Sequence, residues 1–359
     1  MSIHFHSLLI KEVRKETRDC VSITFDIPTE LSEIFQYKQG QYLTLRANIQ
    51  GAEVRRSYSI CSSPLDNELR IAIKKTEQGV FSSYANQYLK KGDRLDVMPP
   101  IGKFFTELNP AHSKQYTGFA AGSGITPLLS IIKTTLATEQ QSSFTLVYGN
   151  RNRHSIIFKE ALEALKNQYI NRFSIIYILS REKTDAAINF GRIDAEKCKL
   201  LGEKNIDISG TDAFFLCGPD EMIFSVKDEL EKSGVDKKKI HFELFTTPDQ
   251  QKKNFAKKDS VEKNEAKSKV TIRLDGVSFD FDLGFDGPAI LDAALEQGAD
   301  LPYACKGGVC CTCRAKLIAG EVDMDVNYGL EPEEIEQGFI LTCQSHPRTE
   351  RIVVDFDSK

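Results

Sequence analysis

Residues 302–313 read PYACKGGVCCTC, and they place Cys305, Cys310 and Cys313 at the spacing C-x4-C-x2-C. A fourth cysteine, Cys343, follows in the segment LTCQ. Two irons bridged by sulfide need four thiolates, and in one common arrangement three of them come from a single tight loop with this spacing. The pattern therefore predicts a [2Fe–2S] cluster with these four cysteines as metal ligands.

Gly307 and Gly308 favour this interpretation, because residues without a side chain let backbone N–H groups turn towards the cluster sulfurs. Two alternatives stay open. A structural zinc site also uses cysteine, although it prefers two well-separated C-x2-C pairs, and a chance group of cysteines holds no metal. Cys311 lies between the expected ligands but off their spacing, so we expect a thiol beside the cluster that is not a ligand.

Length and composition limit the possible classes of protein. A chain of 359 residues suits two or three domains. Its 41% hydrophobic and 27% charged residues are typical of a soluble globular protein. No apolar run approaches the roughly 20 residues of a membrane-spanning helix, and the N-terminus lacks a signal-peptide pattern. Nine cysteines, four of which fit a cluster, favour a reducing cytoplasm over a disulfide framework.

The charge is unevenly distributed. Residues 270–359 contain 7 Lys or Arg and 17 Asp or Glu, whereas the rest of the chain contains 40 and 34. Nothing in this distribution suggests a nucleic-acid partner. The acidic C-terminal region is either an ordinary solvated surface or a surface that guides an encounter with a more basic body or acceptor.

The region around the cysteine loop has the signals of a small α+β domain. Two strand-like runs flank Asp275-Gly276, a strong two-residue hairpin signal. A helical run then starts at Pro288 and can end at Gly298. With the cysteine loop, these features resemble the plant-type ferredoxin domain and imply its β-grasp fold for residues 269–359.

Residues 1–107 contain many short alternating runs bounded by turn residues, which predicts an antiparallel β-barrel. In the segment RSYS, Arg56 and Tyr58 are two residues apart and so point to the same side of a strand. A guanidinium suits a pyrophosphate, and a phenol ring can stack on a flat cofactor. An ordinary half-buried strand explains the pair equally well without further motifs.

A second motif follows at Gly79 and Ser82. Backbone N–H groups and hydroxyls at the start of a helix can cradle a phosphate, and residues 84–89 are helix-like. These elements, in this order, resemble the FAD-binding barrel of the ferredoxin–NADP reductase superfamily. The resemblance implies that Arg56 pairs with the FAD pyrophosphate, Tyr58 stacks on the isoalloxazine ring, and Ser59 bonds near its reactive N5.

Residues 110–248 alternate strand-like and helical runs, which predicts a doubly wound α/β domain with ligands at the carboxyl ends of its strands. The loop after the first strand resembles the pyridine-nucleotide loop of the same superfamily. Glycines allow a phosphate to approach closely, and a proline preorganises the first helical turn. The candidate nucleotide-binding residues of this loop are Gly122, Gly124, Thr126 and Pro127.

Cys217-Gly218-Pro219 ends a later strand and precedes a helix. The resemblance places the cysteine of this motif near the nicotinamide, although a buried structural thiol is an alternative. It also implies that Glu243, near the end of the domain, assists the hydride site together with Ser59 and Cys217. The terminal aromatic residue of the ferredoxin–NADP reductases is absent, because the chain continues, and the residue that covers the flavin face stays open.

Ser180 and Arg181 follow another strand, where the adenosine ribose is expected. A hydroxyl and a guanidinium suit the 2′-phosphate that distinguishes NADPH from NADH. Glu182 is the kind of residue that favours NADH, but it follows the pair and Lys183 offsets it. The pair also resembles the 2′-phosphate site of ferredoxin–NADP reductases, so we expect a preference for NADPH; a surface turn with an incidental arginine is the alternative.

Residues 249–268 are rich in Lys, Gln and Asn and read as a mobile linker between domains. The three domains in this order imply electron transfer from NADPH (or NADH) through FAD to the cluster, because FAD accepts two electrons together and releases them singly. The order resembles the reductase components of bacterial multicomponent oxygenases. The segments 150–158 and 324–330 extend the resemblance to reductases that serve a non-haem di-iron oxygenase acting on an aromatic acyl-CoA.

Two alternative functions remain from the sequence. One is a reductase for a different acceptor, such as an NADH-dependent component of a ring-hydroxylating dioxygenase. The other is not an enzyme but a redox-sensing or zinc-stabilised binding protein. A brown protein whose flavin absorbance is bleached by NAD(P)H excludes the second alternative.

Overall fold

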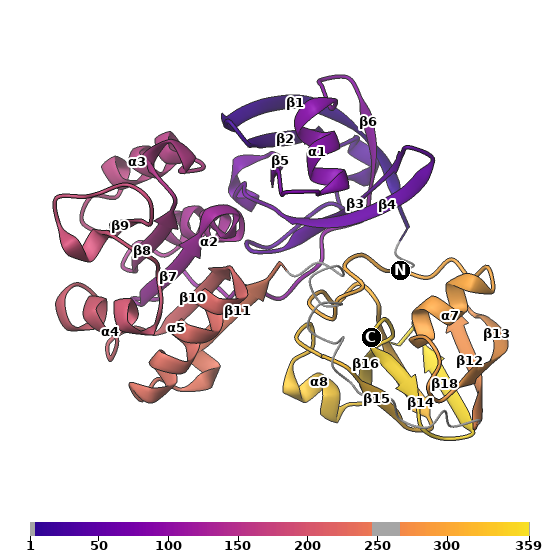
Figure 1. Ribbon diagram of the computed structural model, residues 1–359. Helices are drawn as coiled ribbons and strands as arrows, with labels where there is room; N and C mark the ends of the chain where they lie inside the picture. Colours follow the sequence, from indigo (N-terminus) through magenta and orange to yellow (C-terminus); the bar gives the residue numbers. More distant parts are fainter. Residues whose placement is uncertain (1–3, 246–265, 359) are drawn as a thin grey trace. The chain divides into compact units, whose positions relative to one another are not determined.

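The computed structural model describes residues 4–245 and 266–358, and its residues divide into two compact units. The first unit comprises residues 6–245 and contains two domains (Figure 1). The second unit contains the C-terminal domain. Most of the expected linker, residues 249–265, lies outside the described residues. In residues 4–245 and 266–358, no helix is long and apolar enough to cross a membrane.

The N-terminal domain is an antiparallel β-barrel, as the sequence predicts. Its strand order is β4-β3-β6-β1-β2-β5. An antiparallel bridge between Ile60 and Ile71 joins the two ends of this order and closes the barrel. The strands are β1 (His6–Thr17), β2 (Cys20–Asp26), β3 (Tyr42–Ile49), β4 (Ala52–Ser59), β5 (Leu69–Lys74) and β6 (Arg94–Val97).

Helix α1 (Val80–Gln87) packs against β2, β3, β4 and β5. It begins four residues earlier than the helix-like run at 84–89 suggests. Gly79 is its N-cap, and the Ser82 hydroxyl accepts a hydrogen bond from the Thr76 backbone N–H at 3.1 Å. These local bonds start the helix inside the motif that reads as a loop in the sequence.

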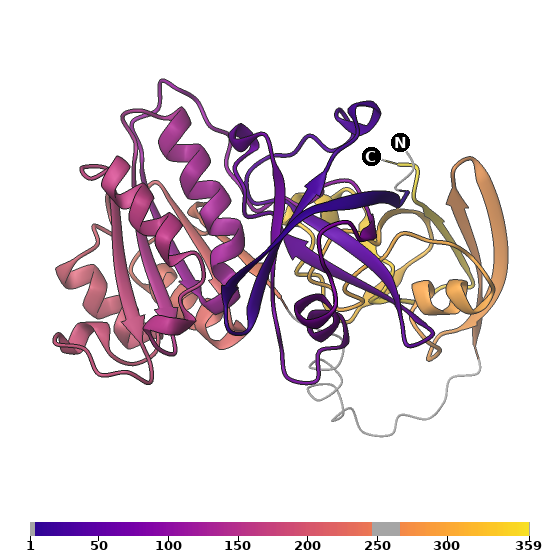
Figure 2. The same ribbon diagram turned by 90° about the horizontal axis from the view of Figure 1, so that it is seen from above.

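The second domain is a parallel sheet with strand order β11-β10-β7-β8-β9. Because crossovers between parallel strands are right-handed, helices before and after the reversal of this order lie on opposite faces of the sheet, as Figure 2 shows. The elements are β7 (Gln115–Ala121), α2 (Ile125–Thr138), β8 (Ser143–Asn150), α3 (Lys159–Gln168), β9 (Phe173–Leu179), α4 (Ala195–Lys204), β10 (Ala213–Gly218), α5 (Asp220–Lys232) and β11 (Ile240–Leu244). This confirms the doubly wound α/β expectation.

The strand order reverses between β7 and β10. Ligands of such sheets bind in the crevice outside the carboxyl ends of the strands at this point. The loop Gly122–Gly124 follows β7, and Cys217-Gly218 ends β10. The fold therefore brings two motifs of the expected nucleotide site together.

The two domains of the first unit share a hydrophobic core. Cys20, Cys61 and Phe104 from the N-terminal region belong to the same buried cluster as Ile125 and Leu128 of α2. This packing fixes α2 against the barrel within the unit.

The C-terminal domain has a mixed sheet with strand order β13-β12-β18-β14-β16. Its β12–β13 hairpin turns at Asp275 and Gly276, both with positive φ, as the sequence predicts. Strand β12 begins at Lys267, two residues before the expected domain boundary. The elements are β12 (Lys267–Leu274), β13 (Val277–Gly284), α7 (Ile290–Glu296), β14 (Arg314–Ala319), β15 (Val322–Met324), α8 (Pro332–Glu336), β16 (Phe339–Leu341), β17 (Ser345–Pro347) and β18 (Arg351–Asp355).

Short 3-10 helices occur in the connections. They are η1 (Thr29–Leu31), η2 (Pro64–Asp66), η3 (Gly122–Gly124), η4 (Arg153–Ser155), η5 (Ala187–Asn189) and η6 (Lys237–Lys239).

Candidate electron-transfer site

The four cysteines of the predicted cluster site converge in the C-terminal domain. The Sγ atoms of Cys305 and Cys310 are 3.1 Å apart. The Cys313 and Cys343 thiols lie within hydrogen-bond distance of each other and close to the first pair. The sulfurs thus form two adjacent pairs, and this donor set fits a two-iron cluster in which each iron takes two thiolates. Across the described residues, no group of His, Cys, Asp and Glu has the geometry to hold a single metal ion.

The backbone around these thiols is shaped by small residues. The Gly307 N–H donates to the Cys305 Sγ at 3.2 Å. Gly308 has a φ of +70°, and a Cβ there would lie 2.4 Å from the Val326 side chain. Only glycine therefore fits this position without strain. Cys311 is half-buried and belongs to neither sulfur pair.

Gln344 is a supporting residue that lies outside every motif noted in the sequence. Its Nε2 donates to the Lys306 carbonyl at 3.2 Å and to the Cys343 carbonyl at 2.8 Å. It also lies 3.5 Å from the Cys343 Sγ. One amide thus ties the loop of three cysteines to the fourth.

In the barrel, β4 carries the predicted flavin residues. Arg56 and Tyr58 are partly buried and pair with Leu45 and Leu43 of β3. The Tyr58 ring lies 5.6 Å from the Phe81 ring of α1. Burial raises the pKa of the Tyr58 hydroxyl, so it stays protonated at neutral pH.

The start of α1 has the shape of a phosphate cradle. A Cβ at Gly79 would lie 2.2 Å from the Thr76 hydroxyl and 2.4 Å from the Ser82 hydroxyl. No side chain caps the helix N-terminus at Gly79. Its first backbone N–H groups therefore suit an anionic group such as a pyrophosphate.

The nucleotide loop is held tightly against β10. A Cβ at Gly124 would lie 2.0 Å from the Cys217 carbonyl oxygen, so the loop reaches this position only with glycine. Gly122 has a φ of +55°, and its carbonyl accepts a hydrogen bond from the Tyr148 hydroxyl at 2.9 Å. Tyr148 is a second supporting residue that no sequence motif marks.

The remaining residues of the motif shape the start of α2. The Thr126 hydroxyl donates to the Ser123 carbonyl at 2.9 Å, and Pro127 is buried in the first turn. A Cβ at Gly218 would lie 2.7 Å from the Met222 side chain and 3.1 Å from Ala121. The loop after β7 and the end of β10 therefore approach each other closely, as a site for a nucleotide requires.

The candidate hydride-site residues come together although they are far apart in sequence. The Ser59 hydroxyl at the end of β4 donates to the Glu243 Oε2 at 2.8 Å. Cys217 and Glu243 are partners in the parallel pairing of β10 and β11. Burial, and to a lesser degree the Glu243 carboxylate, raises the pKa of the Cys217 thiol well above its ordinary value. Cys217 is therefore a neutral thiol at physiological pH.

Ser180 and Arg181 lie just beyond β9, beside the end of β8. The Arg181 N–H donates to the Arg151 carbonyl at 2.8 Å, and both arginine side chains are exposed. The Glu182 carboxylate binds the backbone N–H and the guanidinium of Arg153. These bonds hold the pKa of Glu182 below its usual range. The acidic residue is thus paired with Arg153, and two exposed guanidinium groups remain at this edge.

Asn150 lies between this edge and the glycine loop. Its carbonyl accepts the Ser180 N–H at 2.9 Å. Its amide is buried close to the Tyr148 hydroxyl, but neither Nδ2 nor Oδ1 completes a hydrogen bond among the described residues. Buried amides normally have partners, and a bound nucleotide can supply them.

A barrel with a flavin motif, a nucleotide domain and a domain with paired cysteines together define the class of iron–sulfur flavoprotein reductases. Models of three protein families match this chain in the same order. They are the oxidoreductase FAD-binding domain at residues 7–106, the oxidoreductase NAD-binding domain at 119–228 and the 2Fe-2S iron-sulfur cluster binding domain at 272–348.

Relatives match over almost their whole lengths. The chain is 46% identical to a subunit of the 1,2-phenylacetyl-CoA epoxidase of Escherichia coli, covering 99% of this chain and 98% of the relative. It is 32% identical to the ferredoxin reductase component of the 3-ketosteroid-9-alpha-monooxygenase of Rhodococcus rhodochrous, covering 97% and 96%. Phthalate dioxygenase reductase has a similar fold, with a TM-score of 0.59, 22% identity and 98% of both chains covered.

The chain therefore belongs to the family of reductase components that pass electrons to oxygenases. It has the FAD-binding, nucleotide-binding and [2Fe–2S] domains of that family.

Proposed function

We propose that this protein passes electrons from NADPH, through FAD and the [2Fe–2S] cluster, to a di-iron oxygenase that epoxidises phenylacetyl-CoA. The observation that carries the proposal is the 46% identity to a phenylacetyl-CoA epoxidase subunit over 99% of the chain. FAD accepts two electrons from the nucleotide together and supplies them singly to the cluster. The chain's own residues hold and orient these groups.

In the barrel, Arg56 binds the FAD pyrophosphate, and the backbone at Gly79 and Ser82 provides further N–H donors. Guanidinium groups and uncapped helix N-termini both favour phosphate oxygens. Tyr58 offers an aromatic face to the flavin ring, and its position beside Phe81 holds that face in place.

At the hydride site, Ser59, Cys217 and Glu243 act together. The hydrogen bond from Ser59 to Glu243 orients the hydroxyl, so that it can serve as a proton carrier between the flavin site and the carboxylate. The neutral Cys217 thiol presents a small, uncharged surface for the nicotinamide ring. Gly124 and Gly218 let the nucleotide approach this surface closely.

In the C-terminal domain, Cys305, Cys310, Cys313 and Cys343 bind the two irons. The contact between Cys305 and Cys310 supports one pair of ligands on one iron. The contact between Cys313 and Cys343 supports the other pair. Cys311 is left as a thiol that is not a ligand.

The preference for NADPH rests on Ser180 and Arg181. Arg181 and Arg151 present exposed guanidinium groups at one edge, while Glu182 is occupied by Arg153. A charge-assisted bond to the 2′-phosphate contributes about 1.5–3 kcal/mol. Replacing Arg181 by Ala should therefore weaken NADPH binding about tenfold to a hundredfold and leave NADH binding nearly unchanged.

The test is steady-state kinetics with both nucleotides on the wild type, Arg181→Ala and the neighbouring control Lys183→Ala. The proposal predicts that only Arg181→Ala loses selectivity. A wild type that prefers NADH, or a variant that weakens both nucleotides equally, contradicts it.

The acceptor is tested by reconstitution. This chain, in place of the homologous reductase component of the E. coli epoxidase, should support NADPH-dependent epoxidation of phenylacetyl-CoA by the remaining epoxidase components. Rapid reduction of cytochrome c without any epoxidation indicates a reductase for a different oxygenase. We place the protein in the cytoplasm, since thiolate ligands to iron suit a reducing compartment.

A further inference from the structure

A cluster of polar side chains joins the barrel to α2 within the first unit. It connects the segment after β4 with one face of the helix, because residues three and four apart lie side by side on a helix. We call this cluster the α2 clamp. Its members are Ser62, Ser63 and Asp66 from the barrel and Ser130, Lys133 and Thr134 from α2.

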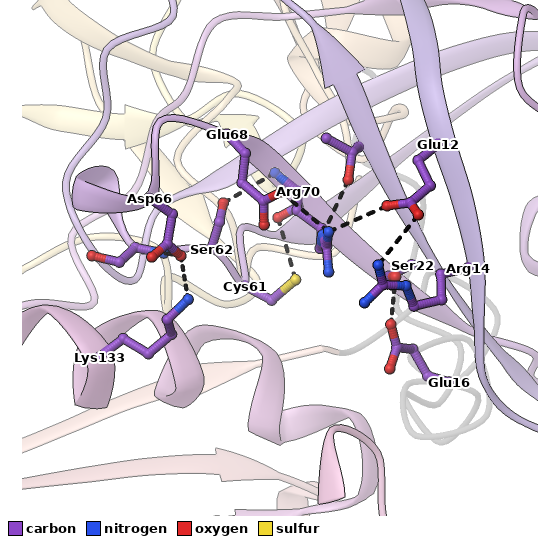
Figure 3. A network of polar contacts seen from close by, with 12 residues as sticks. Glu12, Arg14, Glu16, Ser22, Cys61, Ser62, Asp66, Glu68, Arg70 and Lys133 are labelled. Atoms are coloured by element: carbon purple, nitrogen blue, oxygen red, sulfur yellow. Dashed lines mark hydrogen bonds and ion pairs between the residues drawn. The ribbon is translucent and has the colours of Figure 1, made fainter. Parts of the chain in front are cut away.

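Three contacts make up the clamp. The Ser130 hydroxyl donates to the Ser62 carbonyl at 2.6 Å. The Thr134 and Ser63 hydroxyls lie 2.9 Å apart. The Lys133 ammonium forms an ion pair with Asp66, which Figure 3 shows at the edge of α2.

Most of the clamp is buried, although its groups are polar. Ser63 is 2% exposed, Ser130 is not exposed and Thr134 is 6% exposed. Buried hydroxyls cost free energy unless they are bonded, and apolar residues of similar size would fill the space at lower cost. Directional bonds, unlike apolar contacts, fix one geometry between two elements.

The barrel side of the clamp is itself rigid. The Ser63 backbone N–H donates to Asp66 at 2.8 Å, and the Ser63 hydroxyl accepts from Leu65, which fixes η2. The Ser62 hydroxyl accepts the Arg70 N–H at 3.0 Å. The Arg70 guanidinium is held in turn by Glu12, Thr24 and Glu68, as the dashed lines of Figure 3 show around Arg70.

Both ends of this connection reach the hydride site. On one side, the clamp begins three residues after Ser59, whose hydroxyl binds Glu243. On the other side, α2 starts at the glycine loop, where Gly124 contacts the Cys217 carbonyl. Ser130 lies between one and two turns from the start of α2, so the helix transmits the clamped position directly to the loop.

We propose that Ser130, Lys133 and Thr134 are positioning residues that hold the nucleotide loop at the reactive distance from the Ser59 end of β4. The inference rests on the proposed function, since it concerns the transfer of hydride from NADPH to FAD. In that transfer one hydrogen and two electrons leave NADPH, which is oxidised to NADP+, and FAD is reduced. Displacements of about 1 Å can slow such a transfer about a hundredfold.

The test compares Ser130→Ala, Thr134→Val, Lys133→Met and the double variant Ser130→Ala/Thr134→Val as full-length holoproteins. Anaerobic stopped-flow mixing with NADPH gives the limiting rate of flavin reduction, its half-saturating NADPH concentration and the long-wavelength charge-transfer absorbance. NADPH deuterated at the transferred position gives the kinetic isotope effect.

The expected result is at least a tenfold lower limiting rate in the double variant, with a weaker charge-transfer band and a larger isotope effect. FAD content and half-saturation should stay within about threefold of the wild type. Thr134→Ser should restore the rate, because it keeps the hydroxyl. Ser225→Ala and Lys227→Met on α5 are matched controls, since Ser225 also bonds a helix carbonyl and Lys227 also forms an ion pair; both should behave as wild type.

Wild-type limiting rates and charge-transfer bands in the clamp variants overturn the inference. A wild-type protein whose flavin neither nucleotide reduces overturns the proposed function instead. If the double variant does not fold, Thr134→Val against Thr134→Ser decides, because these two differ at one hydroxyl. Equal rates in that pair contradict the clamp.

Discussion

The Ser59 hydroxyl and the Glu243 carboxylate are 2.8 Å apart, although the two residues belong to different domains of the first unit. Ser59 ends β4 of the barrel, and Glu243 lies on β11, the edge strand of the parallel sheet. Ser59 is buried, and Cys217 neighbours Glu243 on the adjacent strand. The arrangement joins the flavin motif to the nucleotide motif through one hydrogen bond.

We expect Ser59→Ala and Glu243→Gln each to slow flavin reduction by NADPH. Removing one oriented polar group from a reaction centre typically costs about a hundredfold or more in rate, and FAD content should not change. Stopped-flow reduction measures the rate. Ser57→Ala is the matched control on the same strand, where the hydroxyl lies 3.3 Å from the Thr44 hydroxyl of β3. Wild-type rates in both variants contradict a role for this pair.

Much of this site follows from the sequence, because its motifs are local. The cysteine spacing, the segment of Arg56 to Ser59 and the glycine loop each use neighbouring residues. Backbone geometry explains their local specificity, as Gly124 and Gly308 have no room for a Cβ. Three domains and their fold classes were therefore predictable.

The supporting contacts were not predictable in the same way. Tyr148, Gln344 and the members of the α2 clamp reach partners that are distant in sequence, and no periodicity or motif marks such pairs. The start of α1 was also missed, because hydrogen bonds of Ser82 extend the helix into a segment that reads as a loop. Tertiary packing decides these features.

A second prediction concerns Glu139, which is fully buried at the end of α2. Its carboxylate accepts hydrogen bonds from Ser142 at 2.7 Å and Tyr116 at 2.9 Å, and it pairs with His112 at 2.8 Å. Burial acts to raise the pKa of Glu139, but these bonds outweigh burial and hold it below its usual range. Glu139→Ala should lower the free energy of unfolding by about 3 kcal/mol or more, because it leaves buried donors without an acceptor.

Urea denaturation at pH 7 measures this change in stability. The exposed Glu107, which pairs with Lys38, provides the control, and Glu107→Ala should change stability by less than about 1 kcal/mol. Equal effects of the two substitutions contradict the structural role of Glu139.

A third prediction concerns pH and His241. The His241 ring stacks on Phe215 at 5.2 Å, and burial lowers the pKa of His241 in the folded state. An unfolded histidine binds a proton with a pKa of about 6.5, so the unfolded state takes up protons first as the pH falls. Stability should therefore decrease as the pH falls below about 6.5 and continue to decrease towards the lower folded pKa.

His241→Phe keeps the stacked ring and removes this proton-linked loss. The variant should gain stability relative to the wild type on going from pH 8 to pH 5.5, as urea denaturation at both values shows. His154→Gln, at an exposed position, should show no such gain. A wild-type-to-variant difference that is independent of pH contradicts the prediction.

A fourth prediction assigns the iron ligands. Serine in place of Cys305, Cys310, Cys313 or Cys343 should abolish or severely reduce the iron content, because each thiolate belongs to one of the two sulfur pairs. Cys311→Ser should keep two irons per chain and the visible spectrum of the wild type. Iron and sulfide analysis of purified protein measures this. Loss of the cluster in Cys311→Ser, together with retention in one of the four other variants, means that the assignment is wrong.

The order of electron transfer is the central claim, and a full-length chain that lacks only the cluster tests it most directly. Cys343→Ser, loaded with FAD, is mixed with NADPH without oxygen, and electron delivery to the oxygenase is then measured beside the wild type. We predict flavin reduction at the wild-type rate and loss of delivery to the oxygenase, since the cluster is the exit from the flavin. Undiminished delivery by the chain without a cluster would contradict the proposed route.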